Sequence, residues 1–419
     1  MSDAVFTSGR PRRMMRSQTD PLTGGRASGG GRDIPPPIEP QEPVLGALGG
    51  PGRAMRGILD VRPAVFPLAG RHAIALALRH AGLKPGDRVL VPEYHCQAMI
   101  DPVLRLGAEP VIFPLADDLS VDVSRLAPLA EGARALLAVH YFGFVQDFRA
   151  LATFCRERDI IFIEDCAHCV FGEAGGQPVG AAGDYAIASL RKFLPLRDGA
   201  VLVSARRDIS ALALTPPSAT AAAKGWYRML EQATAHGRLG LLGPVIRAVE
   251  AGRSGPVPQP ASAAAPAVPA VAGAEGVFAA SMERMALPAS LRALARRLAG
   301  GAGAGVRRRN FERLLAGLAD LPGCRPLAVA GEAQAPYLCP LWMDDLVRIF
   351  PRLEDAALPM QRFGQFPWAG MDMEAHPLAR ELAAHVVQFS CHQSLTEGEI
   401  DHMIRRIRAA VTGGPPIPG

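Results

Sequence analysis

Short apolar segments alternate with helical segments between residues 88 and 163, and this alternation restricts the fold more than any other feature. The apolar runs are Val89–Val91, Pro110–Phe113, Ala135–Val139 and Ile160–Ile163. Short, continuously apolar strands are typical of a parallel sheet that is covered by helices on both faces. The sequence therefore predicts an α/β fold with a mostly parallel sheet. In such folds, ligands bind beyond the carboxyl ends of the strands.

The segment Ile160–Ser204 places reactive side chains at such strand ends. Asp165 ends one apolar strand, and a second strand leads into Ser189-Leu190-Arg191-Lys192. Lys192 stands out because the chain has 42 arginines and only three lysines. Arginine stays protonated, whereas a lysine amine can lose its proton and bond covalently to a carbonyl carbon. The ordinary alternative for any one lysine is a solvated surface position.

Composition and charge exclude several classes of protein. The net charge of +5 is spread along 419 residues without a basic, aromatic-rich cluster, so we expect no nucleic-acid partner. Seven cysteines without framework spacing indicate reduced thiols and a cytoplasmic protein. Cys166 and Cys169 form one C-x-x-C without a second pair, so no metal is expected. No apolar stretch is long enough to span a bilayer, and we expect no membrane association.

Composition also predicts how the chain is divided. Residues 1–54 are rich in Gly, Pro, Ser and Arg and should form a disordered leader. Residues 55–300 should form the large domain, with an irregular Ala/Pro-rich insertion at about 211–275. This insertion should contain an irregular helical stretch around Trp226 and Tyr227. Residues 301–413 should form a smaller α+β domain. Its last helix is expected to open at the capping box Thr396-Glu397-Gly398-Glu399.

The residues at the strand ends suit pyridoxal 5'-phosphate (PLP). Lys192 would bind the aldehyde and shuttle a proton, and Asp165 would keep the ring nitrogen protonated so that the ring can accept electrons. His168, three residues beyond the aspartate, could donate to the phenolic oxygen. Each of these residues also has an ordinary structural interpretation, but their order and spacing together are more specific.

The remaining parts of the cofactor also have candidate partners. Gly70 and Arg71 begin a helical segment, where free backbone N–H groups can bind a phosphate, and Ser189 could add a hydroxyl. His95 or Tyr94 could lie over the face of the ring. The predicted cofactor-binding set is therefore Gly70, Arg71, His95, Asp165, His168, Ser189 and Lys192.

These motifs resemble the DegT family of PLP-dependent sugar aminotransferases, which have PLP fold type I. The resemblance is carried by Leu83–Pro92, Val139–Gly143, Ile163–His168, Ser189–Gly199 and Ser394–Ile400. It implies a PLP-binding large domain and a smaller C-terminal domain. It also implies transfer of an amino group from a donor such as glutamate to a keto acceptor such as a nucleotide-linked keto sugar. Family members act in sugar and polysaccharide biosynthesis as homodimers, with active sites at the subunit interface.

The chain departs from the family at several places, including the short segment from Ser189 to Lys192 and the single glycine of Gly199-Ala200. Gly70-Arg71-His72 stands where the family usually has Ser-Gly-Thr, and Cys96 aligns with the usual ring-stacking aromatic residue. Residues 211–275 replace a segment that helps to bind the substrate of the partner subunit. Two alternatives therefore stay open: another PLP reaction, such as dehydration or acyl transfer, and a non-catalytic interaction module on the same fold.

Overall fold

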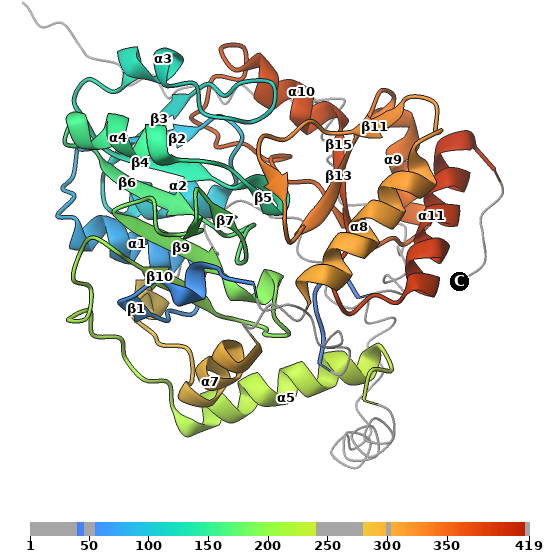
Figure 1. Ribbon diagram of the computed structural model, residues 1–419, viewed down its shortest axis with the longest axis horizontal. Coiled ribbons are helices and arrows are strands. Elements are labelled where there is room, and N and C mark those ends of the chain that lie inside the picture. The colour runs from blue at the N-terminus through green and yellow to red at the C-terminus, as the bar shows by residue number, and fades with distance from the viewer. Residues whose placement is uncertain (1–39, 46–54, 240–279, 299–302, 415–419) are drawn as a thin grey trace, which may run out of the picture. The chain divides into compact units, whose positions relative to one another are not determined.

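The computed structural model describes residues 40–45, 55–239, 280–298 and 303–414 (Figure 1). Most of the predicted leader and the Ala/Pro-rich run at 256–272 lie outside these residues. Within them, no helix combines the length and the apolar character needed to cross a membrane.

A seven-stranded sheet forms the centre of the larger part, in the order β1-β10-β9-β6-β4-β2-β3. Five of its strands are parallel, which confirms the predicted α/β class: β2 (Arg88–Pro92), β3 (Glu109–Phe113), β4 (Ala133–Val139), β6 (Ile161–Asp165) and β9 (Tyr185–Ser189). β10 (Ala200–Val203) runs antiparallel to β9 and to β1 (Ala64–Val65). All five residues of β6 are buried, as expected for a strand covered on both faces.

Helices connect the parallel strands, because parallel neighbours need a crossover. The connections and flanking helical turns are α1 (Gly70–His80), α2 (Gln97–Arg105), α3 (Val123–Leu126), α4 (Arg149–Glu157) and the 3₁₀ turns η1 (Ile58–Asp60), η2 (Ala127–Leu129), η3 (Tyr141–Gly143) and η4 (Leu190–Lys192). Together with the sheet they enclose one large hydrophobic core. The short pair β7 (Glu173–Ala174) and β8 (Gln177–Pro178) forms a hairpin after β6.

Part of the predicted irregular insertion is a regular helix. Ser218 caps α5 (Ala219–Ala235) by accepting a hydrogen bond from the backbone of Ala221. The indole of Trp226 donates to the Ser290 hydroxyl at 2.9 Å and so ties α5 to α7 (Ala289–Leu298). The turn η6 (Ala280–Met282) precedes α7. The helical stretch expected around Trp226 and Tyr227 is therefore present, and it is a regular helix of 17 residues.

The C-terminal part has its own antiparallel sheet, in the order β11-β13-β15-β14, and its own hydrophobic cluster. Its elements are α8 (Ala304–Leu318), β11 (Cys324–Pro326), β12 (Glu332–Ala333, paired with β5, Phe144–Val145), β13 (Leu338–Met343), α9 (Leu346–Asp355), β14 (Met360–Gln361), α10 (Pro377–His385), β15 (Val386–Ser390) and α11 (Glu397–Thr412). The capping box at Thr396 and Glu399 is present as predicted. The domain boundary near residue 300 stays a prediction.

Six residues of the predicted leader, 40–45, lie against the end of β15. The His392 ring is 2.7 Å from the carbonyl oxygen of Pro40, and the Ser390 hydroxyl donates to the carbonyl of Gln41. The backbone N–H of Val44 donates to Ser394, and the Val44 side chain is buried. Disorder was the wrong expectation for these residues, because partners more than 300 positions away satisfy their backbone groups and bury their apolar atoms.

Candidate active site

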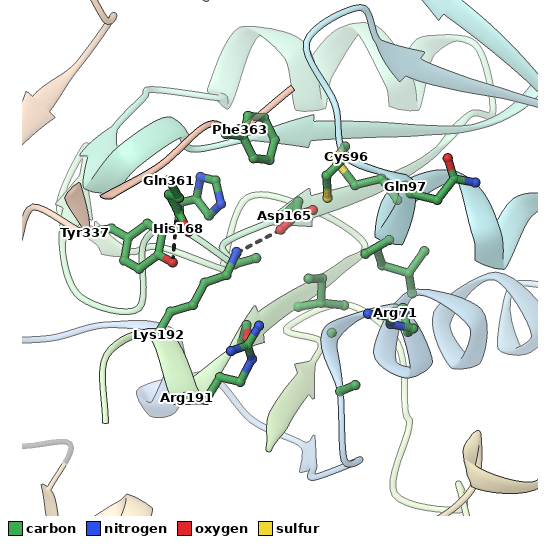
Figure 2. Close-up of a pocket in the computed structure, with 18 of the residues that line it drawn as sticks. Arg71, Cys96, Gln97, Asp165, His168, Arg191, Lys192, Tyr337, Gln361 and Phe363 are labelled. Carbon is green, nitrogen blue, oxygen red and sulfur yellow. Dashed lines mark hydrogen bonds between the residues drawn. The ribbon is translucent and has the colours of Figure 1, made fainter. Parts of the chain in front are cut away.

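A cavity of about 630 Å³ opens at the carboxyl ends of β6 and β9 (Figure 2). The starts of α1 and α2, the turn η4 and the segment that begins at β14 complete its wall. This volume lies in the range typical of cofactor and substrate sites. The cavity also lies at the edge of the sheet where the sequence pattern placed a ligand.

The structure brings six of the seven predicted site residues to this cavity. The residues that line it are Gly70, Arg71, Asp165, His168, Ser189 and Lys192. His95 does not line it.

Lys192 ends the turn η4, and its side chain is half-buried. Its amine points toward the Asp165 carboxylate (Figure 2) and lies 5.2 Å from the centre of the Tyr337 ring. The pKa of Lys192 is lowered to about 8, mainly by burial and also by the nearby Arg191 guanidinium, while Cys96 and the Asp165 carboxylate oppose this shift. A substantial fraction of the amine is therefore unprotonated near neutral pH, as a nucleophilic lysine requires.

Asp165 is the last residue of β6 and is buried. Its carboxylate accepts a hydrogen bond from the backbone N–H of Ala167 at 2.8 Å. Burial raises the pKa of Asp165, and the Ala167 N–H and the Lys192 charge oppose this shift. A buried carboxylate of this kind can hold a proton on a ring nitrogen, because the two charges would stabilise each other away from water.

Glu164 lies on the opposite face of β6, as the alternation of side chains along a strand predicts. Its carboxylate accepts hydrogen bonds from the backbone N–H groups of Gly180 and Ala182 and lies 2.9 Å from His140 Nε2. Burial favours the neutral form, but the hydrogen bonds from His140 and the backbone keep the pKa of Glu164 below its usual value. Glu164 therefore supports the loop from 180 to 183 and leaves Asp165 as the carboxylate in the cavity.

The Glu164, His140 and Cys166 ligand atoms lie within 4.8 Å of one another. However, His140 Nδ1 accepts the backbone N–H of Gln146, and its Nε2 faces Glu164. Both ring nitrogens are engaged, so we interpret this cluster as a structural hydrogen-bond network.

The His168 ring is buried among three aromatic rings, those of Phe142, Tyr337 and Phe363, at centroid distances of 5.7, 5.0 and 4.8 Å. Among the described residues, its Nδ1 atom has no hydrogen-bond partner. Burial lowers the pKa of His168 well below its usual value, so the ring is neutral. A buried nitrogen without a partner costs free energy, which indicates that a ligand completes this site.

The start of α1 forms the other end of the cavity. The residue before the helix is Ala69, whose methyl side chain cannot cap the free N–H groups. A Cβ atom placed on Gly70 would lie 4.0 Å from the Cβ atom of Ser189, so the hydroxyl-bearing residue is adjacent to the helix start. Arg71 adds a positive charge to the same wall. An uncapped helix start with a hydroxyl and a guanidinium suits a phosphate group.

His95 lies away from the cavity because the backbone uses both of its ring nitrogens. Nδ1 is 3.0 Å from the carbonyl oxygen of Pro92, and Nε2 accepts the N–H of Trp368 at 3.1 Å. The Tyr94 hydroxyl donates to the carbonyl of Phe363. These two side chains therefore fix the segment 363–368, and Cys96 lines the cavity in their place.

Sequence reasoning missed several residues of the cavity wall: Glu42, Arg191, Tyr337, Gln361 and Phe363. Arg191 directly precedes Lys192 in the same motif, and this position could have identified it as a residue of the cavity. The others come from the leader and the C-terminal part, and no local pattern marked them. They reach the cavity only through the tertiary fold.

Arg307 links the C-terminal part to the reactive lysine. This arginine of α8 is almost fully buried and donates to the carbonyl oxygens of Lys192 at 3.0 Å and Pro336 at 3.1 Å. Its guanidinium also lies 4.5 Å above the Phe193 ring. Arg307 therefore positions the backbone of Lys192 and of the residues Pro336 and Tyr337, which directly precede β13.

The residues in the cavity fit PLP. They provide an amine with a lowered pKa, a buried carboxylate that this amine faces, an imidazole nitrogen without a partner and an uncapped helix start with a hydroxyl. These groups match the aldehyde, ring nitrogen, phenolic oxygen and phosphate of that cofactor.

Comparison with known proteins agrees with this chemistry. Residues 53–203 match the DegT/DnrJ/EryC1/StrS aminotransferase family. This matched segment is similar to the family over 151 residues, about a third of the chain. The match covers the central sheet and the residues Gly70, Asp165, His168, Ser189 and Lys192.

Curated relatives are similar over the same part of the chain. A UDP-N-acetyl-3-dehydro-alpha-D-glucosamine 3-aminotransferase from Acidithiobacillus ferrooxidans is 30% identical over 39% of this chain and 46% of its own length. The GDP-perosamine synthase of Vibrio cholerae is 30% identical over 35% and 41%, respectively. The L-glutamine:scyllo-inosose aminotransferase of Streptomyces griseus is 32% identical over 34% of each chain. The chain thus spans less than half the length of these DegT-family relatives.

Solved structures extend the likeness to the C-terminal part. A putative sugar aminotransferase from Streptococcus pneumoniae, in its PLP form, has a TM-score of 0.60 at 16% identity and covers 87% of this chain and 93% of its own. A DegT/DnrJ/EryC1/StrS aminotransferase from Brucella abortus has a TM-score of 0.58 at 18% identity and covers 84% and 87%. At these identities the likeness shows the fold alone, and it confirms the expected α/β fold class.

Proposed function

We propose that this protein is a PLP-dependent aminotransferase that transfers an amino group from an amino acid donor, such as glutamate, to a keto acceptor. The observation that carries the proposal is the position of Lys192, whose amine has a pKa of about 8 and faces the buried Asp165 carboxylate inside the cavity. The family match over residues 53–203 supports it.

The roles of the residues follow from their surroundings. Asp165 would hold the proton on the ring nitrogen, and His168 Nδ1 would contact the phenolic oxygen. The start of α1, Arg71 and Ser189 would hold the phosphate. PLP, when bound, supplies an aldehyde that takes up the amino group and a ring that accepts the electron pair from the donor Cα.

Lys192 is the residue suited to move the proton. Its side chain is half-buried, its carbonyl is held by Arg307, and its pKa of about 8 lies close to neutral pH. A general base works best when its pKa lies near the working pH. Lys192 would therefore take a proton from the donor Cα and deliver it to the carbon that carried the aldehyde.

The acceptor, the assembly and the compartment are part of the same proposal. Several relatives are named for nucleotide-linked sugars, with UDP or GDP as the carrier, which supports a nucleotide-linked keto sugar as acceptor. We propose a homodimer, because the family resemblance implies a shared active site. All seven cysteines lie in the described residues and none forms a disulfide, which supports a cytoplasmic setting.

A half-reaction experiment tests the proposal. The PLP-loaded protein is mixed with L-glutamate, and both the cofactor spectrum and the released keto acid are measured. The pyridoxamine form is then given a panel of keto sugars. We expect stoichiometric keto acid from the wild type and none from Lys192→Ala, with Lys84→Ala as the matched lysine control on the exposed surface.

Other outcomes would separate the alternatives. Release of water or an acyl product without amination of any acceptor would favour another PLP reaction. PLP binding without keto acid release would favour a non-catalytic role. One relative, from Geobacillus stearothermophilus, is named a pleiotropic regulatory protein and is 30% identical over 31% of this chain. Its name is the reason why a non-catalytic role is included among the outcomes tested.

A further inference from the structure

We propose that Arg191 binds the α-carboxylate of the amino donor, and that Glu42 of the leader occupies this position until the donor displaces it. This inference rests on the proposed aminotransferase function and assigns its donor site. It makes the segment 40–45 part of the active site.

Arg191 is well placed for this role. It precedes Lys192 directly, lines the cavity, and its side chain is 45% exposed, so a ligand can reach it. Its charge lowers the pKa of Lys192, which shows that the guanidinium and the amine are near each other. In an α-amino acid, one carbon separates the amino nitrogen from the carboxylate carbon. A donor whose nitrogen lies at the Lys192 amine therefore places its carboxylate close by.

The structure already shows a carboxylate at this guanidinium. Arg191 forms an ion pair and a hydrogen bond with Glu42, and Glu42 also lines the cavity. The Glu42 side chain is only 22% exposed. The pair shows that this position in the cavity accepts a carboxylate, which is the group that every amino acid donor carries.

The position of Glu42 is fixed by the residues on both sides of it. The Gln41 side chain donates to the carbonyl of Met360, and the Ser390 hydroxyl donates to the Gln41 carbonyl. On the other side, Val44 exchanges hydrogen bonds with the Ser394 hydroxyl. The backbone of the segment is therefore anchored to the C-terminal part, so displacement by the donor would require movement of the Glu42 side chain only.

The other cations of the wall are less suitable. Arg71 lies at the helix start that suits the phosphate, 4.0 Å from Asp101. Arg362 donates to the carbonyl of Ala383 and lies 4.9 Å above the Phe350 ring, so its guanidinium is held by other groups. Arg197 lies on the exposed turn after η4. Arg191 is the cation of this wall that a carboxylate of the same cavity binds.

The expected effects follow from the exposure of the pair. Charge-assisted hydrogen bonds contribute strongly to binding, so loss of Arg191 should weaken donor binding and raise the donor KM about 10- to 100-fold. A partly exposed ion pair contributes little, so releasing Arg191 from Glu42 should lower the donor KM by at most about fivefold. The two substitutions thus act in opposite directions.

The test compares two donors that differ only in the α-carboxylate, L-glutamate and 4-aminobutyrate, in the half-reaction with the PLP-loaded enzyme. Arg191→Gln should raise the KM for L-glutamate and leave the KM for 4-aminobutyrate within twofold. Glu42→Gln should lower the KM for L-glutamate. Arg197→Gln removes the same charge from the same wall and serves as the matched control, with an L-glutamate KM within twofold of the wild type.

The outcomes distinguish this inference from the function on which it rests. A wild type without any half-reaction contradicts the proposed function. A wild type that reacts with L-glutamate while Arg191→Gln keeps its KM overturns the donor site alone. Weaker PLP binding in Arg191→Gln, with an unchanged donor KM, would assign Arg191 to the phosphate and also overturn it. An increased L-glutamate KM in Glu42→Gln would refute displacement.

Discussion

The lowered pKa of Lys192 gives the sharpest quantitative prediction. With a pKa of about 8, roughly one amine in eleven is unprotonated at pH 7, whereas an ordinary lysine with a pKa of about 10.4 has well under one in a thousand. The free-amine fraction is therefore a few hundred times larger than for a solvated lysine. Burial is the main cause, because it disfavours the charged form.

Competitive labelling of the cofactor-free protein measures this directly. A trace of an amine-reactive acylating reagent is added at a series of pH values, and the modification of each lysine is quantified by peptide mass spectrometry. The chain has three lysines, and Lys84 and Lys224 are exposed, so they act as references in the same sample. Restricted access of the reagent lowers the extent of Lys192 labelling at every pH but does not change the pH at which labelling is half-maximal. We expect this midpoint near pH 8.

Two substitutions test the cause of the shift. Arg191→Gln removes a positive charge and should raise the pKa of Lys192, while Asp165→Asn removes a negative charge and should lower it. The labelling midpoint should move up in the first variant and down in the second. A wild-type midpoint above pH 10, or midpoints that move in the opposite directions, would refute the account of this site.

Three further predictions concern the frame around the site. Glu164→Gln should lower the free energy of unfolding by about 3–5 kcal/mol in urea titrations, because a buried, multiply hydrogen-bonded charge is lost; a loss under 1 kcal/mol would contradict the network. Because the pKa of Glu164 is depressed in the fold, its stabilisation is present above the unfolded pKa of about 4.5 and is lost as the pH falls below that value. Arg307→Met should slow the half-reaction and shift the Lys192 midpoint, with Arg307→Lys restoring part of both; an unchanged midpoint would mean that Arg307 serves stability alone. Gly143→Ala should lower the free energy of unfolding more than Gly86→Ala. Both glycines have positive φ, but a Cβ atom at 143 would lie 2.5 Å from a backbone atom, whereas one at 86 would have no atom within 4 Å. Equal losses would show that the backbone around residue 143 can move to accommodate the methyl group.

The sheet and the cofactor end of the site could be predicted from sequence because both depend on local patterns. The apolar run at Ile161–Asp165 ends where the strand ends, so it located Asp165 at the edge of the sheet and Glu164 on the other face. The composition of the chain drew attention to Lys192, because only three of its 45 basic residues are lysines. The capping box at Thr396 likewise depends on two residues three positions apart.

The other wall of the site depends on contacts that no local pattern encodes. Tyr337 directly precedes β13 and Gln361 ends β14, and Glu42 reaches the cavity because residues near 390 hold the leader. His95 follows a strand end, as predicted, but its ring turns toward the backbone of Pro92 and Trp368. Proximity to a strand end therefore predicts position, whereas hydrogen bonds to distant segments decide where a side chain points.

The most direct test of the central claim is to locate the cofactor on the chain. The purified protein is incubated with PLP, treated with borohydride to make the lysine adduct permanent, digested, and mapped by mass spectrometry. The account predicts one equivalent of cofactor on the peptide that contains Lys192, and none in the Lys192→Ala variant. Absence of the adduct, or its equal distribution over Lys84, Lys192 and Lys224, would contradict it.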